Sequence, residues 1–86
     1  MKILLEKIKK LEQLEKLANE AEARYAANPE RADLEKAFDE AYKAEFAEYI
    51  STAKYIESTT SGRIDFMTAK KIIQTKRSEL LNILQA

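Results

Sequence analysis

The chain of 86 residues contains no cysteine, no histidine and no tryptophan, and it has only one glycine and one proline. Without cysteine it can form neither a disulfide nor a thiolate metal site. Without histidine, the usual general base at neutral pH and the commonest transition-metal ligand are both missing. These absences argue against most hydrolase and zinc-enzyme classes. We predict no catalytic residue, no cofactor and no metal site.

Carboxylates are the remaining class of metal ligand. The pairs Glu12 and Glu15, and Glu45 and Glu48, have the Glu-x-x-Glu spacing found in helical metal sites. No second matching pair with an inward-facing aspartate or histidine accompanies them. We therefore interpret both pairs as parts of solvated helix faces.

Long hydrophobic runs are also missing. The apolar residues after Lys2 are interrupted by Glu6 and Lys7, which leaves a run too short for a signal peptide. The longest uncharged run is the tail from Leu80 to Ala86, far short of the roughly 20 residues that a membrane span needs. We expect a cytoplasmic protein that does not contact a membrane.

The residues that are present favour helices, because 45% are apolar, 35% are charged and glycine and proline are nearly absent. In the first segment the apolar positions recur on average every 3.5 residues, at Leu4, Ile8, Leu11, Leu14, Ala18, Ala21 and Tyr25. This spacing predicts a helix over residues 2–27. We expect Asn28 to cap a second helix that begins at Pro29 and continues to about residue 58.

The second helix carries five of the seven aromatic residues, which suggests that it is the central one. One broad face of it collects Leu34, Phe38, Ala41, Tyr42, Phe46, Tyr49, Ala53 and Ile56. A third apolar stripe predicts a helix over residues 66–85. We predict one all-α domain over residues 1–86: a long antiparallel hairpin with the third helix folded back along it. Either a three-helix bundle or a hairpin-based dimer fits this pattern.

The stretch STTSGRID holds the only glycine and raises the question of a phosphate-binding loop. A Walker loop needs two glycines and a lysine between a strand and a helix, and none of this context is present. We interpret the stretch as a corner between helices. Gly62 would adopt the left-handed conformation that ends the second helix, and Asp65 would cap the third.

Three charged residues interrupt the apolar stripes. Glu45 lies within the aromatic face, Arg77 within the third stripe and Lys7 within the first. We predict a structural ion pair of Glu45 with Arg77 or Lys7. The alternative is that these long side chains reach past the apolar surface to water.

The net charge is zero but unevenly distributed. Residues 20–57 carry ten acidic and five basic side chains, whereas residues 58–86 carry five basic and two acidic ones. The basic cluster provides candidate nucleic-acid contacts at Arg63, Lys70, Lys71 and Lys76. Nucleic-acid binding is nevertheless the alternative function, because the chain is neutral overall and these side chains diverge around the helix.

We predict a non-catalytic interaction or regulatory module that acts through helix–helix contacts and associates with itself or with another protein. Apolar residues away from the main stripes provide the candidate partner contacts, of which Ile50, Tyr55 and Ile72 are the ones we select. No small-molecule substrate is inferred. An accessory role in a bacterial mobile element or phage is one setting for such a short helical chain.

Overall fold

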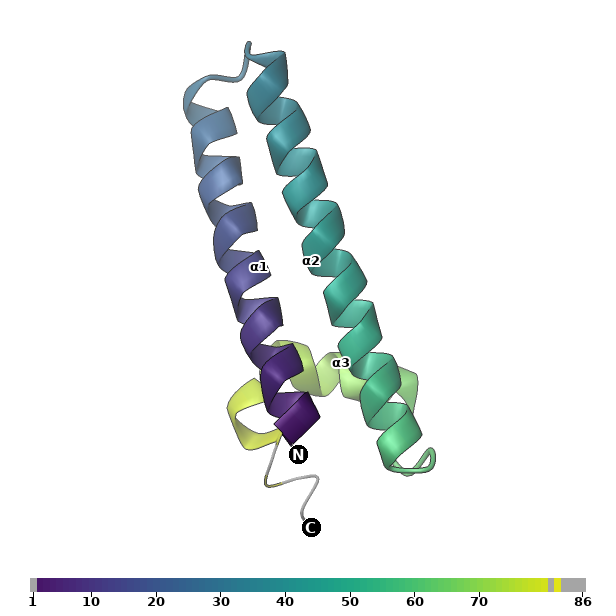
Figure 1. Cartoon of the computed structure of the whole chain (residues 1–86). Helices are drawn as coiled ribbons and strands as arrows, with labels where there is room; N and C mark the ends of the chain where they lie inside the picture. Colours follow the sequence, from purple (N-terminus) through teal and green to yellow (C-terminus); the bar gives the residue numbers. More distant parts are fainter. Residues whose placement is uncertain (1, 81, 83–86) are drawn as a thin grey trace.

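The computed structural model describes residues 2–80 and 82, and within them every regular element is helical (Figure 1). Helix α1 spans Lys2–Ala27, α2 spans Ala32–Thr59 and α3 spans Phe66–Thr75, followed by a short 3₁₀ helix, η1, at Arg77–Glu79. The all-α prediction of a long hairpin plus a third helix is confirmed. The molecule is elongated, about 49 Å by 20 Å by 18 Å.

Helices α1 and α2 lie side by side and antiparallel, joined by residues 28–31 (Figure 1). We call this turn the closed end and the opposite end, where α3 lies, the open end. The predicted start of α2 is wrong by three residues. The Asn28 N–H donates to the carbonyls of Arg24 and Tyr25, so Asn28 terminates α1 instead of capping α2. Pro29 lies in the turn, and α2 begins at Ala32.

Arg31 is the N-cap residue of α2, and its side chain makes no capping hydrogen bond. Its guanidinium instead donates to the Asp33 carboxylate at 2.6 Å and 3.1 Å. These hydrogen bonds are the main reason that the pKa of Asp33 lies below its usual value. Asp33 and Glu35 place negative charge in the first turn of α2, where the helix dipole favours it.

The hydrophobic core lies at the open end, where α3 crosses the hairpin. Its buried members come from the three α-helices, from the corner before α3 and from the position after η1: Leu4, Leu11, Ala53, Ile56, Ile64, Ala69, Ile73 and Leu80. The broad aromatic face of α2 is therefore only partly core. Of its members, Ala53 and Ile56 are fully buried, whereas Tyr42 and Phe46 are exposed.

The corner before α3 follows the sequence interpretation. Gly62 has φ of +82° and its N–H donates to the Glu57 carbonyl at 2.9 Å. Asp65 is the N-cap of α3, and its carboxylate accepts from the Thr68 N–H at 2.8 Å. The chain can therefore turn sharply within a few residues, and Ile64 is buried in the core.

The third helix is shorter than predicted, because it ends at Thr75 and not near residue 85. Lys76 leaves helical geometry with φ of −136° and ψ of 35°, and η1 follows. Residues 81 and 83–86 of the predicted helix lie outside the described residues. Helix α3 passes behind the open end of the hairpin and does not run along it (Figure 1). Along most of their length, α1 and α2 of the hairpin therefore have no third helix from the described part of the chain packed against them.

Candidate interaction surface

Five aromatic side chains lie in a row along one face of the hairpin. We call this row the aromatic seam: Tyr25, Phe38, Tyr42, Phe46 and Tyr49. The α2 members follow one another at spacings of four, four and three residues, which places them on one side of the helix. The Tyr25 ring stacks on Phe38 with centroids 6.1 Å apart, and this contact joins the seam to α1. Phe38 and Tyr42, and likewise Phe46 and Tyr49, have centroids 6.4 Å apart.

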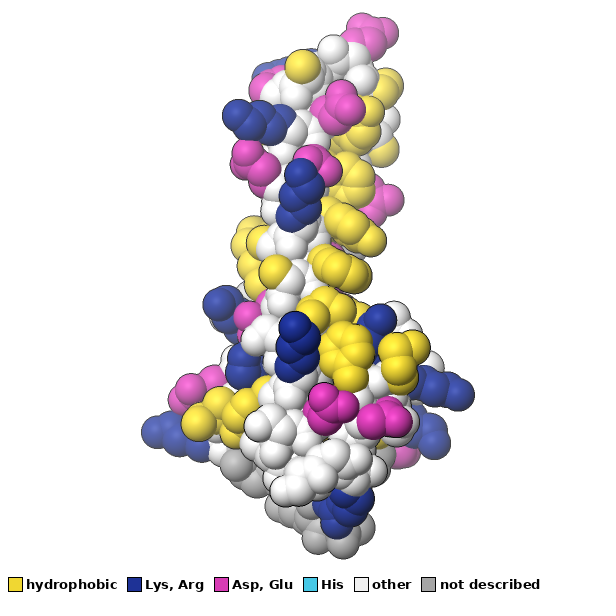
Figure 2. Space-filling view, turned by 90° about the vertical axis from the view of Figure 1, so that its right-hand side faces the viewer, with side chains coloured by type: hydrophobic (Ala, Val, Ile, Leu, Met, Phe, Trp, Pro, Cys, Tyr) yellow, Lys and Arg dark blue, Asp and Glu magenta, His cyan; other side chains and the backbone are white. Residues whose placement is uncertain are grey.

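The middle of the aromatic seam is open to solvent. Tyr42 retains 54% of its exposed surface and Phe46 retains 52%. Figure 2 shows hydrophobic side chains in a column along the right-hand edge of the hairpin, reaching down to the broad foot of the molecule. Neighbouring exposed aromatic side chains of this kind typically mark an interaction site.

Helix α3 covers only the end of the seam that reaches the core. The Tyr49 hydroxyl donates to the Lys70 carbonyl of α3 at 2.9 Å. The Lys70 ammonium lies 6.0 Å from the Tyr49 ring centre and 5.4 Å from that of Phe66. Removal of Tyr49 from water raises its pKa. The exposed seam is thus the direct continuation of the surface against which α3 packs.

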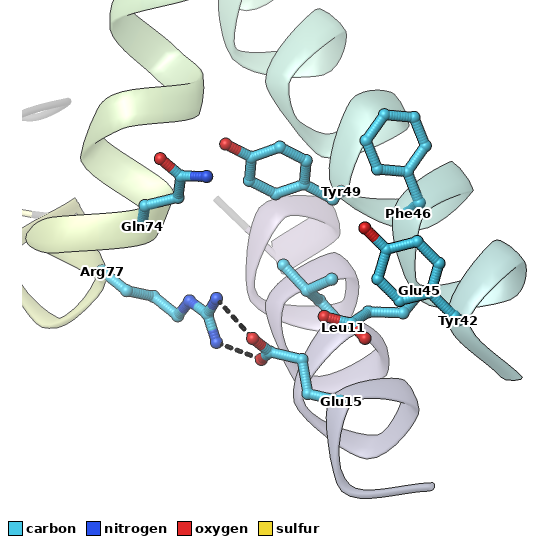
Figure 3. Close-up of a pocket in the computed structure, with 8 residues that line it drawn as sticks. All are labelled: Leu11, Glu15, Tyr42, Glu45, Phe46, Tyr49, Gln74 and Arg77. Atoms are coloured by element: carbon cyan, nitrogen blue, oxygen red, sulfur yellow. Dashed lines mark hydrogen bonds and ion pairs between the residues drawn. The ribbon is translucent and has the colours of Figure 1, made fainter. Parts of the chain in front are cut away.

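A cavity of about 330 Å³ marks the edge of α3 on this face. Its lining combines seam residues with polar side chains of α1, α3 and η1 (Figure 3): Leu11, Glu15, Tyr42, Glu45, Phe46, Tyr49, Gln74 and Arg77. The Arg77 guanidinium donates two hydrogen bonds to the Glu15 carboxylate, one of them 3.1 Å long. This hydrogen-bonded partner is the main cause of a raised pKa at Arg77.

Glu45 lies in the same cavity without forming the predicted ion pair. Arg77 pairs with Glu15, and no salt bridge joins Glu45 to a basic side chain within the described residues. Burial raises the pKa of Glu45, and the nearby Glu15 carboxylate raises it further, whereas Arg77 acts in the opposite direction. The predicted partner of Arg77 is therefore corrected from Glu45 to Glu15.

Lys7 also has different partners from those predicted. Its ammonium donates to the Ser51 hydroxyl at 2.9 Å and lies 3.8 Å from the Glu48 carboxylate. Lys10 approaches the other oxygen of Glu48 at 3.6 Å. The register between α1 and α2 places Glu48 within reach of Lys7. Glu48 lies three residues, about one helical turn, closer to the open end than Glu45.

The three predicted partner contacts lie near the open end. Tyr55 and Ile72 are partly buried and pack against the core, and the Lys7 ammonium lies 5.8 Å from the Tyr55 ring centre. Ile50 is half-buried on α2. The sequence placed Tyr42 and Phe46 on the broad apolar face of α2, without indicating which of its members are exposed. They are exposed because α3 is short, and no glycine or proline near Thr75 indicates in the sequence that the helix ends there.

The candidate nucleic-acid contacts differ in exposure. Arg63, Lys71 and Lys76 are exposed, whereas Lys70 is half-buried over two aromatic rings. Arg77, the other cation of this region, is held by Glu15. Within the described part of the chain, no group of three acidic side chains has the geometry of a metal site. No helix in that part is both long and apolar enough to cross a membrane.

The chain matches no protein-family model, and searches of curated proteins and of solved structures find no significant match either.

Proposed function

We propose that this protein is a non-catalytic helix–helix interaction module that self-associates through the aromatic seam. The observation that carries the proposal is the exposure of Tyr42 and Phe46, two large aromatic side chains on a face that is continuous with the core. Aromatic side chains with this position are typical anchors of protein interfaces.

The size of the chain supports self-association. A domain of this length buries a smaller share of its surface than a larger one and is correspondingly marginal in stability. Here the main core cluster lies at the open end, and two helices alone continue toward the turn. Burying the exposed halves of Tyr42 and Phe46 would contribute on the order of 1 kcal/mol each per copy. The hairpin of a second copy would thus cover the face that α3 leaves exposed.

Mass measured by light scattering after gel filtration tests this function. We expect the assembly to exceed the monomer mass at high micromolar concentration and to dissociate on dilution. Phe46→Gln should weaken association by about tenfold or more, a loss of about 1.4 kcal/mol.

Leu17→Gln is the matched control. Leu17 is 55% exposed, close to the value for Phe46, but it lies beside Gln13, Lys16 and Glu20, away from the seam. Its substitution should leave the dissociation constant unchanged. A chain that is monomeric at every concentration would refute self-association and leave an amphipathic helix of another protein as the occupant of the seam.

Nucleic-acid binding is the second candidate, supported by the exposed side chains of Arg63, Lys71 and Lys76 near the open end. Fluorescence anisotropy with a labelled DNA or RNA duplex tests it. Binding that weakens steeply with salt, and that weakens again on substitution of these three residues, would favour this function over self-association.

A further inference from the structure

We infer that two copies pair antiparallel, with the closed end of each hairpin beside α3 of the other. This inference rests on the proposed self-association and adds the arrangement of the two copies. Two independent features of the structure support it: the position of α3 on the seam face, and the separation of charge along the molecule.

Helix α3 lies on the same face of the hairpin as the aromatic seam. The hydrogen bond from Tyr49 to Lys70 and the cavity shared by Phe46, Gln74 and Arg77 establish this placement. The α3 helix therefore stands out from the face by roughly one helix diameter, about 10 Å. A partner hairpin can occupy the seam only where α3 does not.

A parallel pairing brings the two α3 helices to the same level. Two helices standing between the hairpins would separate the seams by about 20 Å, whereas packed helix axes lie 8–10 Å apart. The seam of one copy would then fail to touch the hairpin of the other, and Tyr42 and Phe46 would stay exposed. In an antiparallel pairing, each α3 lies beyond the closed end of its partner, and the seams meet between them.

The same geometry sets the register. If the partner's turn stops at α3, beside Tyr49, the two-fold axis lies midway between Tyr49 and residues 28–31. That point is near Phe38, where the two helices are joined by the Tyr25 ring. Phe38 of each copy then lies near the axis, and Tyr42 and Phe46 of one copy face the turn-proximal half of the other.

Charge along the hairpin favours the same arrangement. Residues 20–40, around the closed end, carry seven acidic and three basic side chains. Residues 2–10 and 54–80, at the open end, carry ten basic and four acidic ones. Antiparallel copies bring each acidic closed end toward a basic open end, whereas parallel copies place like charges together.

A distance measurement between identical labels distinguishes the two arrangements. The absence of cysteine allows Ser58→Cys to carry a single spin label at an exposed position at the end of α2. The distance along α2 from the axis near Phe38 to residue 58 is about 30 Å. The two labels of an antiparallel pair should therefore lie about 60 Å apart. Parallel copies would hold them within about 35 Å.

Salt dependence gives a second readout on the unlabelled protein. For antiparallel copies, raising sodium chloride from about 50 mM to about 500 mM should increase the dissociation constant at least threefold, because opposite charges are screened. Tighter association at high salt, or a short label distance in a confirmed dimer, would overturn the antiparallel arrangement alone. A monomeric mass at every concentration would overturn both the arrangement and the proposed function.

Discussion

The Arg77 guanidinium and the Glu15 carboxylate form a two-point ion pair across 62 residues of sequence, linking η1 to the middle of α1. The pair closes one wall of the cavity at the edge of α3 and holds the segment after the helix break against the hairpin. Their side chains are 24% and 33% exposed, so the pair lies between a surface contact and a buried one. Glu45 also lines this cavity, but Arg77 forms its salt bridge with Glu15.

Glu15→Gln should therefore destabilise the fold, whereas Glu45→Gln should not. Exposed pairs typically contribute up to about 1 kcal/mol, and losing one partner of a buried pair costs about 3–5 kcal/mol. For this partly exposed pair we expect a loss of about 1–2 kcal/mol in the free energy of unfolding, measured by urea denaturation. The same substitution at Glu45 should change the free energy of unfolding by no more than about 0.5 kcal/mol. Equal losses at the two positions would show that Arg77 divides its interaction between them.

The stability of the Glu45→Gln variant relative to the wild type should depend on pH. Burial raises the pKa of Glu45 above its ordinary value of 4.5, so between the unfolded and folded pKa values the folded state binds more protons. The free energy of unfolding contributed by this group therefore falls as pH rises through that window. Above it, the ionised carboxylate opposes folding.

The glutamine variant should accordingly match or slightly exceed the wild type at pH 7, and this difference should shrink as pH falls through the window above 4.5 and be absent below it. Urea denaturation of both proteins at the two pH values gives the difference directly, because the other carboxylates titrate in both. A variant that is less stable than the wild type at pH 7 would mean that the Glu45 carboxylate has a stabilising cation.

The parts of the fold that short-range signals control could be predicted from the sequence. The apolar spacing of 3.5 residues placed the first helix at residues 2–27, and α1 spans Lys2–Ala27. The lone Gly62 and the cap at Asp65 placed the corner and the start of α3 at Phe66. Each of these features depends on residues within a few positions of one another, so periodicity and turn chemistry are sufficient.

The end of α3 and the exposure of the seam depend on contacts between distant residues. No glycine or proline marks the break at Lys76, which is accompanied by the bond of Arg77 to Glu15 and by the burial of Leu80 in the core. A helical wheel also cannot show whether a third helix is long enough to cover Tyr42 and Phe46. The wheel groups Tyr42 and Phe46 on one face with Ala53 and Ile56, and only the folded structure separates the exposed pair from the buried pair.

Gly62→Val should destabilise the fold by at least about 1 kcal/mol, measured by urea denaturation. The φ of +82° is one that residues with a branched side chain rarely adopt. No atom lies within 4 Å of the position that an added Cβ would occupy, so the cost arises from the backbone and not from a clash. Gly62→Asn should cost less, because asparagine tolerates the left-handed conformation. Equal losses for valine and asparagine would argue that the turn rearranges around either residue.

The cap at Asp65 should make the start of α3 sensitive to both substitution and acid. The hydrogen bond from the Thr68 N–H to the carboxylate holds the pKa of Asp65 below its ordinary value of 3.8. A lowered folded pKa means that the ionised group stabilises the fold at neutral pH, and this contribution is lost as pH falls through the folded value. Asp65→Ala should lower the thermal midpoint, whereas Asp65→Asn, which keeps an acceptor oxygen, should retain much of the cap. The difference between wild type and Asp65→Ala should be constant between about pH 5 and 7 and decrease below about pH 3.8. A difference that is unchanged by acid would assign the cap to the acceptor geometry alone and not to the charge.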